Sequence, residues 1–103
     1  MSYKLIISRN AHDDLTDIAG YITRELNNPQ AAAGFLDDVE ESYRRIINNP
    51  RMYSLCRDER LGRMGYRKIV IKNYLILYRI NEESQEVYIV RIVYEGRNYP
   101  ELL

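Results

Sequence analysis

The sequence predicts an α+β domain: an N-terminal strand, an antiparallel helical hairpin, and a three-stranded antiparallel meander that completes a mainly antiparallel sheet. Two observations lead to this prediction. Apolar residues alternate with polar ones at the amino terminus and again in the second half of the chain, as they do in strands, whereas between these regions they recur every three or four residues, as they do in helices. Two short polar links in the second half are typical of turns between paired strands.

The first strand is predicted over residues 2–7, which are β-favouring and alternate in polarity. The period then changes to that of a helix, and Ser8 is a suitable N-cap because its hydroxyl can accept a backbone N–H. Spacings of three and four residues place the apolar residues of this helix on one face. They are Ala11, Leu15, Ile18, Ala19, Ile22 and Leu26.

A second helix is predicted to begin at Asn28-Pro29, since asparagine caps well and proline is tolerated at the first helical position. The Asn48-Asn49-Pro50 segment ends it. Because the link between the two helices is short, we expect an antiparallel pair that packs against the sheet. The apolar face of the second helix comprises Ala32, Phe35, Leu36, Val39, Tyr43, Ile46 and Ile47.

The second half of the chain is predicted to hold a loop and three strands. Residues 50–65 lack a clear period and are expected to form the loop. The strands follow at 66–71, 74–80 and 86–93. Simple alternation along the last strand places Tyr88, Val90, Ile92 and Tyr94 on one face and Val87, Ile89, Arg91 and Val93 on the other.

Composition limits the classes of function. A chain of 103 residues has room for one domain, which we assign to residues 1–103. Fifteen basic residues balance fifteen acidic ones, so the overall charge gives no reason to expect non-specific binding to nucleic acid or to an anionic membrane. Residues 1–50 carry a net charge of −3 and residues 51–103 a net charge of +3, so an anionic partner is expected to bind the second half.

The sequence gives no sign of a metal, a cofactor or a membrane segment. One cysteine, Cys56, cannot form an internal disulfide, which is typical of a reducing compartment. The only histidine, His12, has no second candidate ligand nearby in the sequence. The longest apolar run at the amino terminus, Leu5 to Ile7, is too short for a signal peptide or a membrane span, so we expect a soluble cytoplasmic protein.

Basic residues concentrate between positions 56 and 72, where six lysines and arginines accompany two acidic residues. Such a patch can neutralise phosphates while neighbouring tyrosines stack on bases. Arginine and tyrosine are equally favoured at protein interfaces, and charged loops also occur simply as solvated surface. The six basic residues are Arg57, Arg60, Arg63, Arg67, Lys68 and Lys72.

A second cluster follows the last strand, where Gly96 lets the chain turn and presents Arg97 beside Tyr94, Glu95 and Tyr99. An arginine at this position can bind a phosphate, and a tyrosine or glutamate can transfer a proton. The alternative is structural, with Arg97 paired to Glu95 or to the C-terminal carboxylate.

The order of elements and three segments together resemble the RelE/ParE superfamily of bacterial type II toxins. The segments are YKLIIS, GYRKIVIKNYLILYRI and VYIVRIVYEGRNYPELL. The resemblance implies the RelE/ParE-like fold and a growth-inhibiting toxin, linked to plasmid stabilisation and neutralised by a cognate antitoxin. It also implies one of two targets, because family members divide into ribosome-dependent mRNA endonucleases and inhibitors of DNA gyrase.

Carried over residue by residue, the resemblance to the RNA-cleaving branch implies Arg67, Arg97 and Tyr99 as catalytic residues. It also implies that the other basic residues of the second half, together with two residues near the C-terminus, form a surface that contacts nucleic acid or another target. These are Arg57, Arg60, Arg63, Lys68, Lys72, Tyr94 and Glu95. Two positions depart from the RNA-cleaving pattern: Leu75 stands where an arginine is usual, and Ile69 where a lysine is usual.

The chain is therefore expected to be a toxin that either cleaves mRNA on the ribosome, with part of the usual catalytic set missing, or binds DNA gyrase. The gyrase-directed branch often has a histidine near Tyr94, which is absent here. The alternative is a non-catalytic protein-binding module retained as an antitoxin partner. We expect a free toxin to expose the apolar surface that its antitoxin covers, and such a surface can also support a homodimer.

Overall fold

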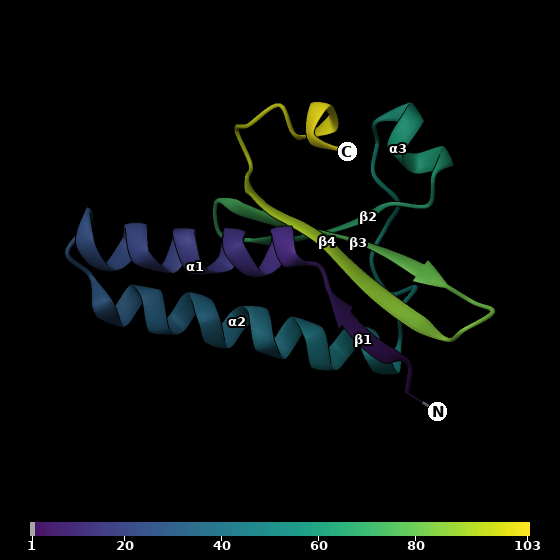
Figure 1. The fold of residues 1–103 in the computed structure, drawn as a ribbon, viewed down its shortest axis with the longest axis horizontal. Coiled ribbons are helices and arrows are strands. Elements are labelled where there is room, and N and C mark those ends of the chain that lie inside the picture. Colours follow the sequence, from purple (N-terminus) through teal and green to yellow (C-terminus); the bar gives the residue numbers. More distant parts are fainter. Residues whose placement is uncertain (1) are drawn as a thin grey trace.

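The computed structural model describes residues 2–103 and confirms the predicted α+β architecture (Figure 1). Its elements, in chain order, are β1 (Lys4–Ile7), α1 (Arg9–Arg24), α2 (Pro29–Asn48), α3 (Glu59–Arg63), β2 (Arg67–Ile71), β3 (Tyr74–Asn81), β4 (Glu86–Tyr94) and the 3-10 helix η1 (Tyr99–Leu102). The four strands form one sheet in the order β1-β4-β3-β2. Strands β2, β3 and β4 are antiparallel neighbours, and β1 lies parallel to β4.

Both long helices begin at the caps that the sequence predicts. The Ser8 hydroxyl oxygen accepts the Ala11 N–H at 3.0 Å, and the Asn28 side-chain oxygen accepts the Ala31 N–H at 3.0 Å. Pro29 occupies the first turn of α2, where no intrahelical N–H donor is needed. No helix among residues 2–103 is long and apolar enough to cross a membrane.

The two long helices pack side by side on one face of the sheet, which we call the inner face (Figure 1). Phe35, Val39 and Ile46 of α2 meet the inward side chains of the strands in the main hydrophobic core. Tyr78 lies at the centre of this core, and its hydroxyl donates to the Pro50 carbonyl at 2.7 Å. The strand contribution comprises Ile69, Ile71, Ile76, Tyr78, Val87, Ile89 and Ile92.

The opposite, outer face is covered only in part, by α3 and the C-terminal turn (Figure 1). A second core forms there from Cys56, Leu61, Tyr66, Leu75, Leu77 and Val93, with Tyr99, Leu102 and Leu103 packed against it. The Arg60 guanidinium fastens the two covering segments together by donating to the carbonyls of Pro100 and Leu103.

The prediction of a loop over residues 50–65 is wrong between Glu59 and Arg63, where α3 forms. The Asp58 carboxylate caps this helix by accepting the Leu61 N–H at 2.9 Å, and Leu61 is completely buried. A five-residue helix has too few apolar positions to show a helical period in the sequence.

The prediction of faces along β4 is also wrong beyond Val90. Leu77 pairs with Arg91 whereas Tyr78 pairs with Ile89, so Val90 is an extra residue, a β-bulge. A bulge reverses the alternation of side chains after it. Val87 and Ile89 therefore face the main core before the bulge, and Ile92 faces it afterwards.

Candidate functional site

Arg67 and Arg97, two of the predicted catalytic residues, lie at opposite ends of the sheet. Arg67 begins β2, and its guanidinium donates to the Tyr53 carbonyl at 2.5 Å. Arg97 follows the far end of β4, where Tyr94 pairs with Tyr74 next to the β2–β3 turn. The structure therefore does not bring the two arginines together, and Arg67 uses part of its donor set to hold a loop.

Arg97 lines a shallow hollow of about 180 Å³ beside α1, together with Asp17, Tyr74 and Tyr94. No carboxylate among residues 2–103 lies within 4.0 Å of its guanidinium, so the structural pairing with Glu95 considered above is not seen. The Arg97 N–H donates to the Tyr94 carbonyl at 3.0 Å, which fixes the turn after β4. We call this group of four residues the Arg97 surface.

Two aromatic rings support the Arg97 surface from within. Tyr94 is 55% exposed, and its ring meets the edge of the Tyr74 ring at a centroid distance of 6.0 Å. Tyr74 in turn packs on Phe35 at 5.1 Å, so the exposed tyrosine is connected to the main core. Glu95 is exposed, and its N–H donates to the Asn73 carbonyl at 2.7 Å, so the turn after β4 is tied to the β2–β3 turn.

Tyr99, the third predicted catalytic residue, donates its backbone N–H to the Arg97 carbonyl at 2.8 Å, but its side chain has other neighbours. Its half-buried side chain packs against the outer core, whereas Arg97 lines the hollow beside α1. Burial raises the pKa of the Tyr99 phenol, with nearby Cys56 and Asp58 adding to the effect. The phenol therefore stays protonated at neutral pH, so it can donate a proton or a hydrogen bond but is a poor base.

The basic residues of the 56–72 stretch are dispersed. Arg60 binds the C-terminal carbonyls, and Arg63 pairs with Glu59 of its own helix at 3.9 Å. Arg57 and Lys72 are exposed. Lys68 is half-buried beside Cys56, whose thiol pKa is raised by burial and lowered to a smaller degree by this lysine.

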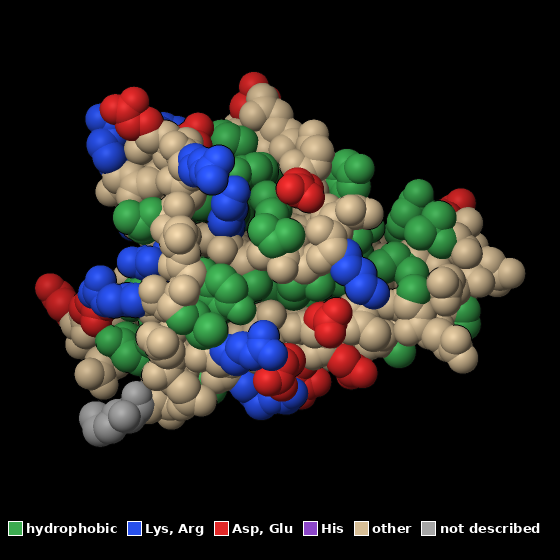
Figure 2. All heavy atoms as spheres, turned by 180° about the vertical axis from the view of Figure 1, so that it is seen from behind, with side chains coloured by type: hydrophobic (Ala, Val, Ile, Leu, Met, Phe, Trp, Pro, Cys, Tyr) green, Lys and Arg blue, Asp and Glu red, His purple; other side chains and the backbone are tan. Residues whose placement is uncertain are grey.

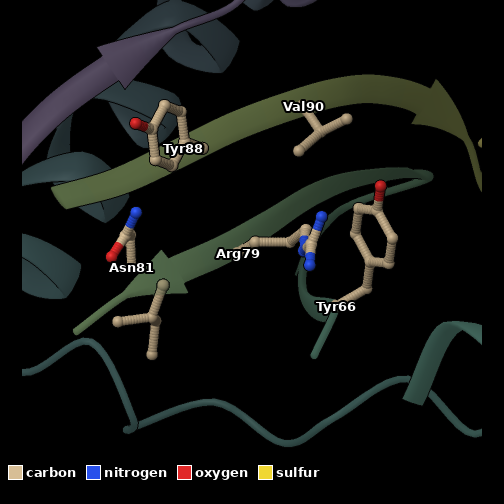
Figure 3. Close-up of a pocket in the computed structure, with 6 residues that line it drawn as sticks. Tyr66, Arg79, Asn81, Tyr88 and Val90 are labelled. Carbon is tan, nitrogen blue, oxygen red and sulfur yellow. The ribbon is translucent and has the colours of Figure 1, made fainter. Parts of the chain in front are cut away.

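A second hollow, of about 420 Å³, lies on the part of the outer face that α3 leaves open (Figure 3). We call it the Arg79 hollow, and its lining consists of Tyr66, Arg79, Ile80, Asn81, Tyr88 and Val90. Arg79 pairs in register with Tyr88 on β4, while Tyr66 directly precedes Arg67, the partner of Tyr78. The three side chains thus form a row from β4 across β3 to the residue before β2, with the arginine between two tyrosines.

Sequence reasoning missed this row because its members come from three separate segments. The available signal was alternation: Leu75, Leu77 and Arg79 share one face of β3, so a charged residue follows two apolar ones on the outer face. Pairing that face with the neighbouring strands requires the register, which the sequence does not supply.

Arg67, Arg97 and Tyr99 do not contact one another through their side chains in this structure. Transfer of protons at a phosphodiester needs a base, an acid and a cation around one phosphate. Arg67, Arg97 and Tyr99 instead have three different sets of neighbours. Among residues 2–103 no group of three or more His, Cys, Asp or Glu side chains is arranged to hold a metal ion.

Residues 5–99 match the family model described as the ParE toxin of the type II toxin–antitoxin system parDE. This match defines the class of the protein as a toxin of a type II toxin–antitoxin system. The chain therefore belongs to the ParE toxin family. No curated protein matches it in sequence.

Solved structures share the fold at low sequence identity. The chromosomal ParDE system of P. aeruginosa superposes with a TM-score of 0.71 at 20% identity, covering 90% of this chain and 96% of that one. The RelBE2 toxin–antitoxin complex of Mycobacterium tuberculosis gives 0.63 at 23% identity, with 91% and 99% covered. A mutant of the E. coli toxin RelE in the free state gives 0.70 at 12% identity, with 99% and 93% covered.

Proposed function

We propose that this toxin arrests growth by binding a protein target, DNA gyrase, through the Arg97 surface, and that a cognate antitoxin neutralises it. The observation that carries this proposal is the dispersion of the predicted catalytic residues. Arg67 is engaged with a backbone carbonyl, Tyr99 is packed on the outer core, and Arg97 lies at the other end of the sheet from Arg67. Such an arrangement supports a contact surface better than an RNA-cleaving centre.

The charge distribution supports the same choice. On the face seen from behind in Figure 2, basic and acidic side chains are interspersed, and apolar side chains lie between them. A protein that threads mRNA is expected to carry a continuous basic surface instead. An exposed tyrosine next to an unpaired arginine, as in the Arg97 surface, is the composition that dominates binding energy at protein interfaces.

Two assays with purified components distinguish DNA gyrase from mRNA as the target of the toxin. In a gyrase supercoiling assay we expect the toxin to inhibit the enzyme, and we expect Arg97→Glu to weaken this inhibition by at least about tenfold because charge reversal at a central contact opposes binding. Arg24→Glu is the matched control, since Arg24 is exposed on α1 and makes no ion pair within the described chain.

The second system is a cell-free translation reaction with one defined mRNA, whose 5′ ends are mapped by primer extension. We expect intact mRNA. New ends that appear only with ribosomes would overturn the gyrase proposal in favour of mRNA cleavage. Intact mRNA together with uninhibited gyrase would instead support the other candidate, a non-catalytic module retained as an antitoxin partner.

An antitoxin partner is supported by apolar side chains that the toxin leaves exposed. Tyr21 and Leu26 near the end of α1 are 50% and 56% exposed, and Leu36 of α2 is 39% exposed. Large apolar side chains left exposed in this way favour association. We expect the free chain to self-associate in sedimentation experiments and to form a defined hetero-complex once its antitoxin is added. Identical sedimentation with and without antitoxin would count against this part of the proposal.

A further inference from the structure

The Arg79 hollow has no part in the proposed gyrase contact. Arg79 pairs with Tyr88 near the start of β4, whereas the Arg97 surface follows the end of that strand. The hollow lies on the outer face, with a volume of about 420 Å³, and its lining side chains come from β3, β4 and the residue before β2 (Figure 3). It is therefore a separate site that another partner can occupy.

Arg79 is held in place by an aromatic ring and not by an acid. Its guanidinium carbon lies 5.0 Å from the centroid of the Tyr66 ring, and Tyr66 is only 6% exposed because it belongs to the outer core. A buried ring is a rigid support, so the planar guanidinium is oriented before any ligand arrives.

The donors of Arg79 are unused. No carboxylate among residues 2–103 lies within 4.0 Å of its guanidinium, and its side chain makes no hydrogen bond to any of these residues. By contrast, Arg51 and Arg91 donate to carboxylates, and Arg60 donates to backbone carbonyls. An oriented guanidinium with free donors matches the geometry of an anionic oxygen pair.

The rest of the lining favours a carboxylate on a protein over a phosphate on a nucleic acid. Arg79 already covers the Tyr66 ring, so Tyr88 is the one tyrosine of the row with substantial exposure, 36%, and two successive bases would lack a second ring to stack on. The Tyr88 hydroxyl donates to the Glu86 carboxylate at 2.7 Å, so the Tyr88 ring is held in place as a surface on which an apolar side chain can rest.

We propose that the Arg79 hollow binds an acidic side chain of the antitoxin, with an adjacent apolar residue of the antitoxin resting on Tyr88 and Val90. The assignment to the antitoxin rests on the proposed function, because that proposal places gyrase on the Arg97 surface at the other end of β4. The carboxylate accepts from the Arg79 guanidinium in a bidentate pair, and the apolar neighbour covers the exposed faces of Tyr88 and Val90.

Binding chemistry can be tested with peptides that require no knowledge of the antitoxin. A random octapeptide library displayed on phage is selected on the folded toxin, and the enriched peptides are synthesised and titrated by fluorescence anisotropy. We expect peptides with Asp or Glu next to an apolar residue, and we expect Arg79→Glu to weaken their binding by at least about tenfold. Arg79→Lys should weaken binding to a smaller extent because it keeps the charge and loses the planar fork.

Arg24→Glu again serves as the control for an equal change of charge, and its peptide affinity should equal that of the unchanged toxin. Arg79 is exposed, so its variants should fold, which circular dichroism and the melting temperature verify. Enriched peptides without an acidic residue, failure to enrich any peptide, or equal binding to Arg79→Glu would overturn the proposal. So would a single-stranded RNA decamer that binds the toxin and loses affinity in Arg79→Glu.

Assignment to the antitoxin is tested in cells by co-expressing the antitoxin from the toxin's own operon. The Arg79→Glu toxin should still arrest growth, and more antitoxin should be needed to restore growth than for the unchanged toxin or for Arg9→Glu, a charge reversal at an exposed residue far along α1 from Tyr21 and Leu26. Equal rescue of all three would overturn the antitoxin assignment. If none of the three toxins arrests growth, the proposed function fails. The proposed ligand of the Arg79 hollow is not affected by that result, because the peptide titrations measure binding to the hollow directly.

Discussion

Asp14 shows how one residue can replace a missing strand. Strand β1 pairs with β4 only as far as Ile89, so the edge of β4 beyond this point has no strand neighbour on that side. The Asp14 carboxylate accepts the Ile92 N–H at 3.0 Å and receives two further hydrogen bonds from Arg91, at 2.8 and 2.9 Å. A backbone donor that would otherwise lack a partner is thereby satisfied, and the first helix is attached to the last strand.

Replacing Asp14 with alanine should destabilise the protein markedly. The side chains of Arg91 and Asp14 are only 17% and 15% exposed, so the variant leaves a poorly solvated guanidinium and a bare N–H, at an expected cost of about 3 kcal/mol. Urea unfolding followed by circular dichroism measures the change. Asp17→Ala, an exposed position in the same helix, is the control and should shift the unfolding free energy by less than about 0.5 kcal/mol.

Two tyrosines of the main core should respond in opposite directions to the loss of their hydroxyls. Burial raises the pKa of both Tyr43 and Tyr78 to about 12, yet only Tyr78 donates a hydrogen bond, to Pro50. The Tyr43 hydroxyl is buried without a partner among residues 2–103. Tyr78→Phe should therefore cost about 1 kcal/mol, while Tyr43→Phe should be neutral or stabilising by up to about 1 kcal/mol. Thermal melting compares them, and a loss of stability in Tyr43→Phe as large as that in Tyr78→Phe would contradict this account.

At the scale of elements, the sequence predicts what local chemistry decides and misses what tertiary contacts decide. Both long helices and their caps at Ser8 and Asn28 are confirmed, because a cap needs only neighbouring residues. Helix α3 and the bulge at Val90 were missed, since the first depends on burying Leu61 and the second on the register between β3 and β4. The site shares this limit: Arg67 is recognisable as a basic strand residue, but its bond to Tyr53 depends on how a loop folds back.

The hydrogen bonds of Arg60 that join α3 to the C-terminal turn can be tested by removing them. Arg60→Ala removes both hydrogen bonds to the carbonyls of Pro100 and Leu103, and we expect a loss of about 1–2 kcal/mol together with faster amide hydrogen exchange at Leu103. The matched control is Arg63→Ala, because Arg63 pairs only with the exposed Glu59. Unchanged exchange at Leu103 in Arg60→Ala would show that packing alone holds the turn.

At the scale of the whole molecule, equal numbers of basic and acidic residues limit what the toxin can bind by charge alone. Affinity for nucleic acid depends on salt in proportion to the number of phosphates neutralised. We expect binding of a single-stranded RNA to be weak, with a plot of log affinity against log salt no steeper than about −2. Fluorescence anisotropy over a salt series measures this slope, and a slope several times steeper would indicate a continuous basic track.

The bulge at Val90 also affects how this chain can be compared with its relatives. Loss of the single codon for residue 90 would remove the bulge and leave Ile92 and Tyr94 on the inner side of the sheet, because Ile89 and Ile92 would then lie two positions apart, as in a regular strand. A homologue without the bulge therefore needs a one-position gap at this point of the alignment. Without that gap, every residue assigned after it, Arg97 included, would be matched to a neighbour on the wrong side of the strand.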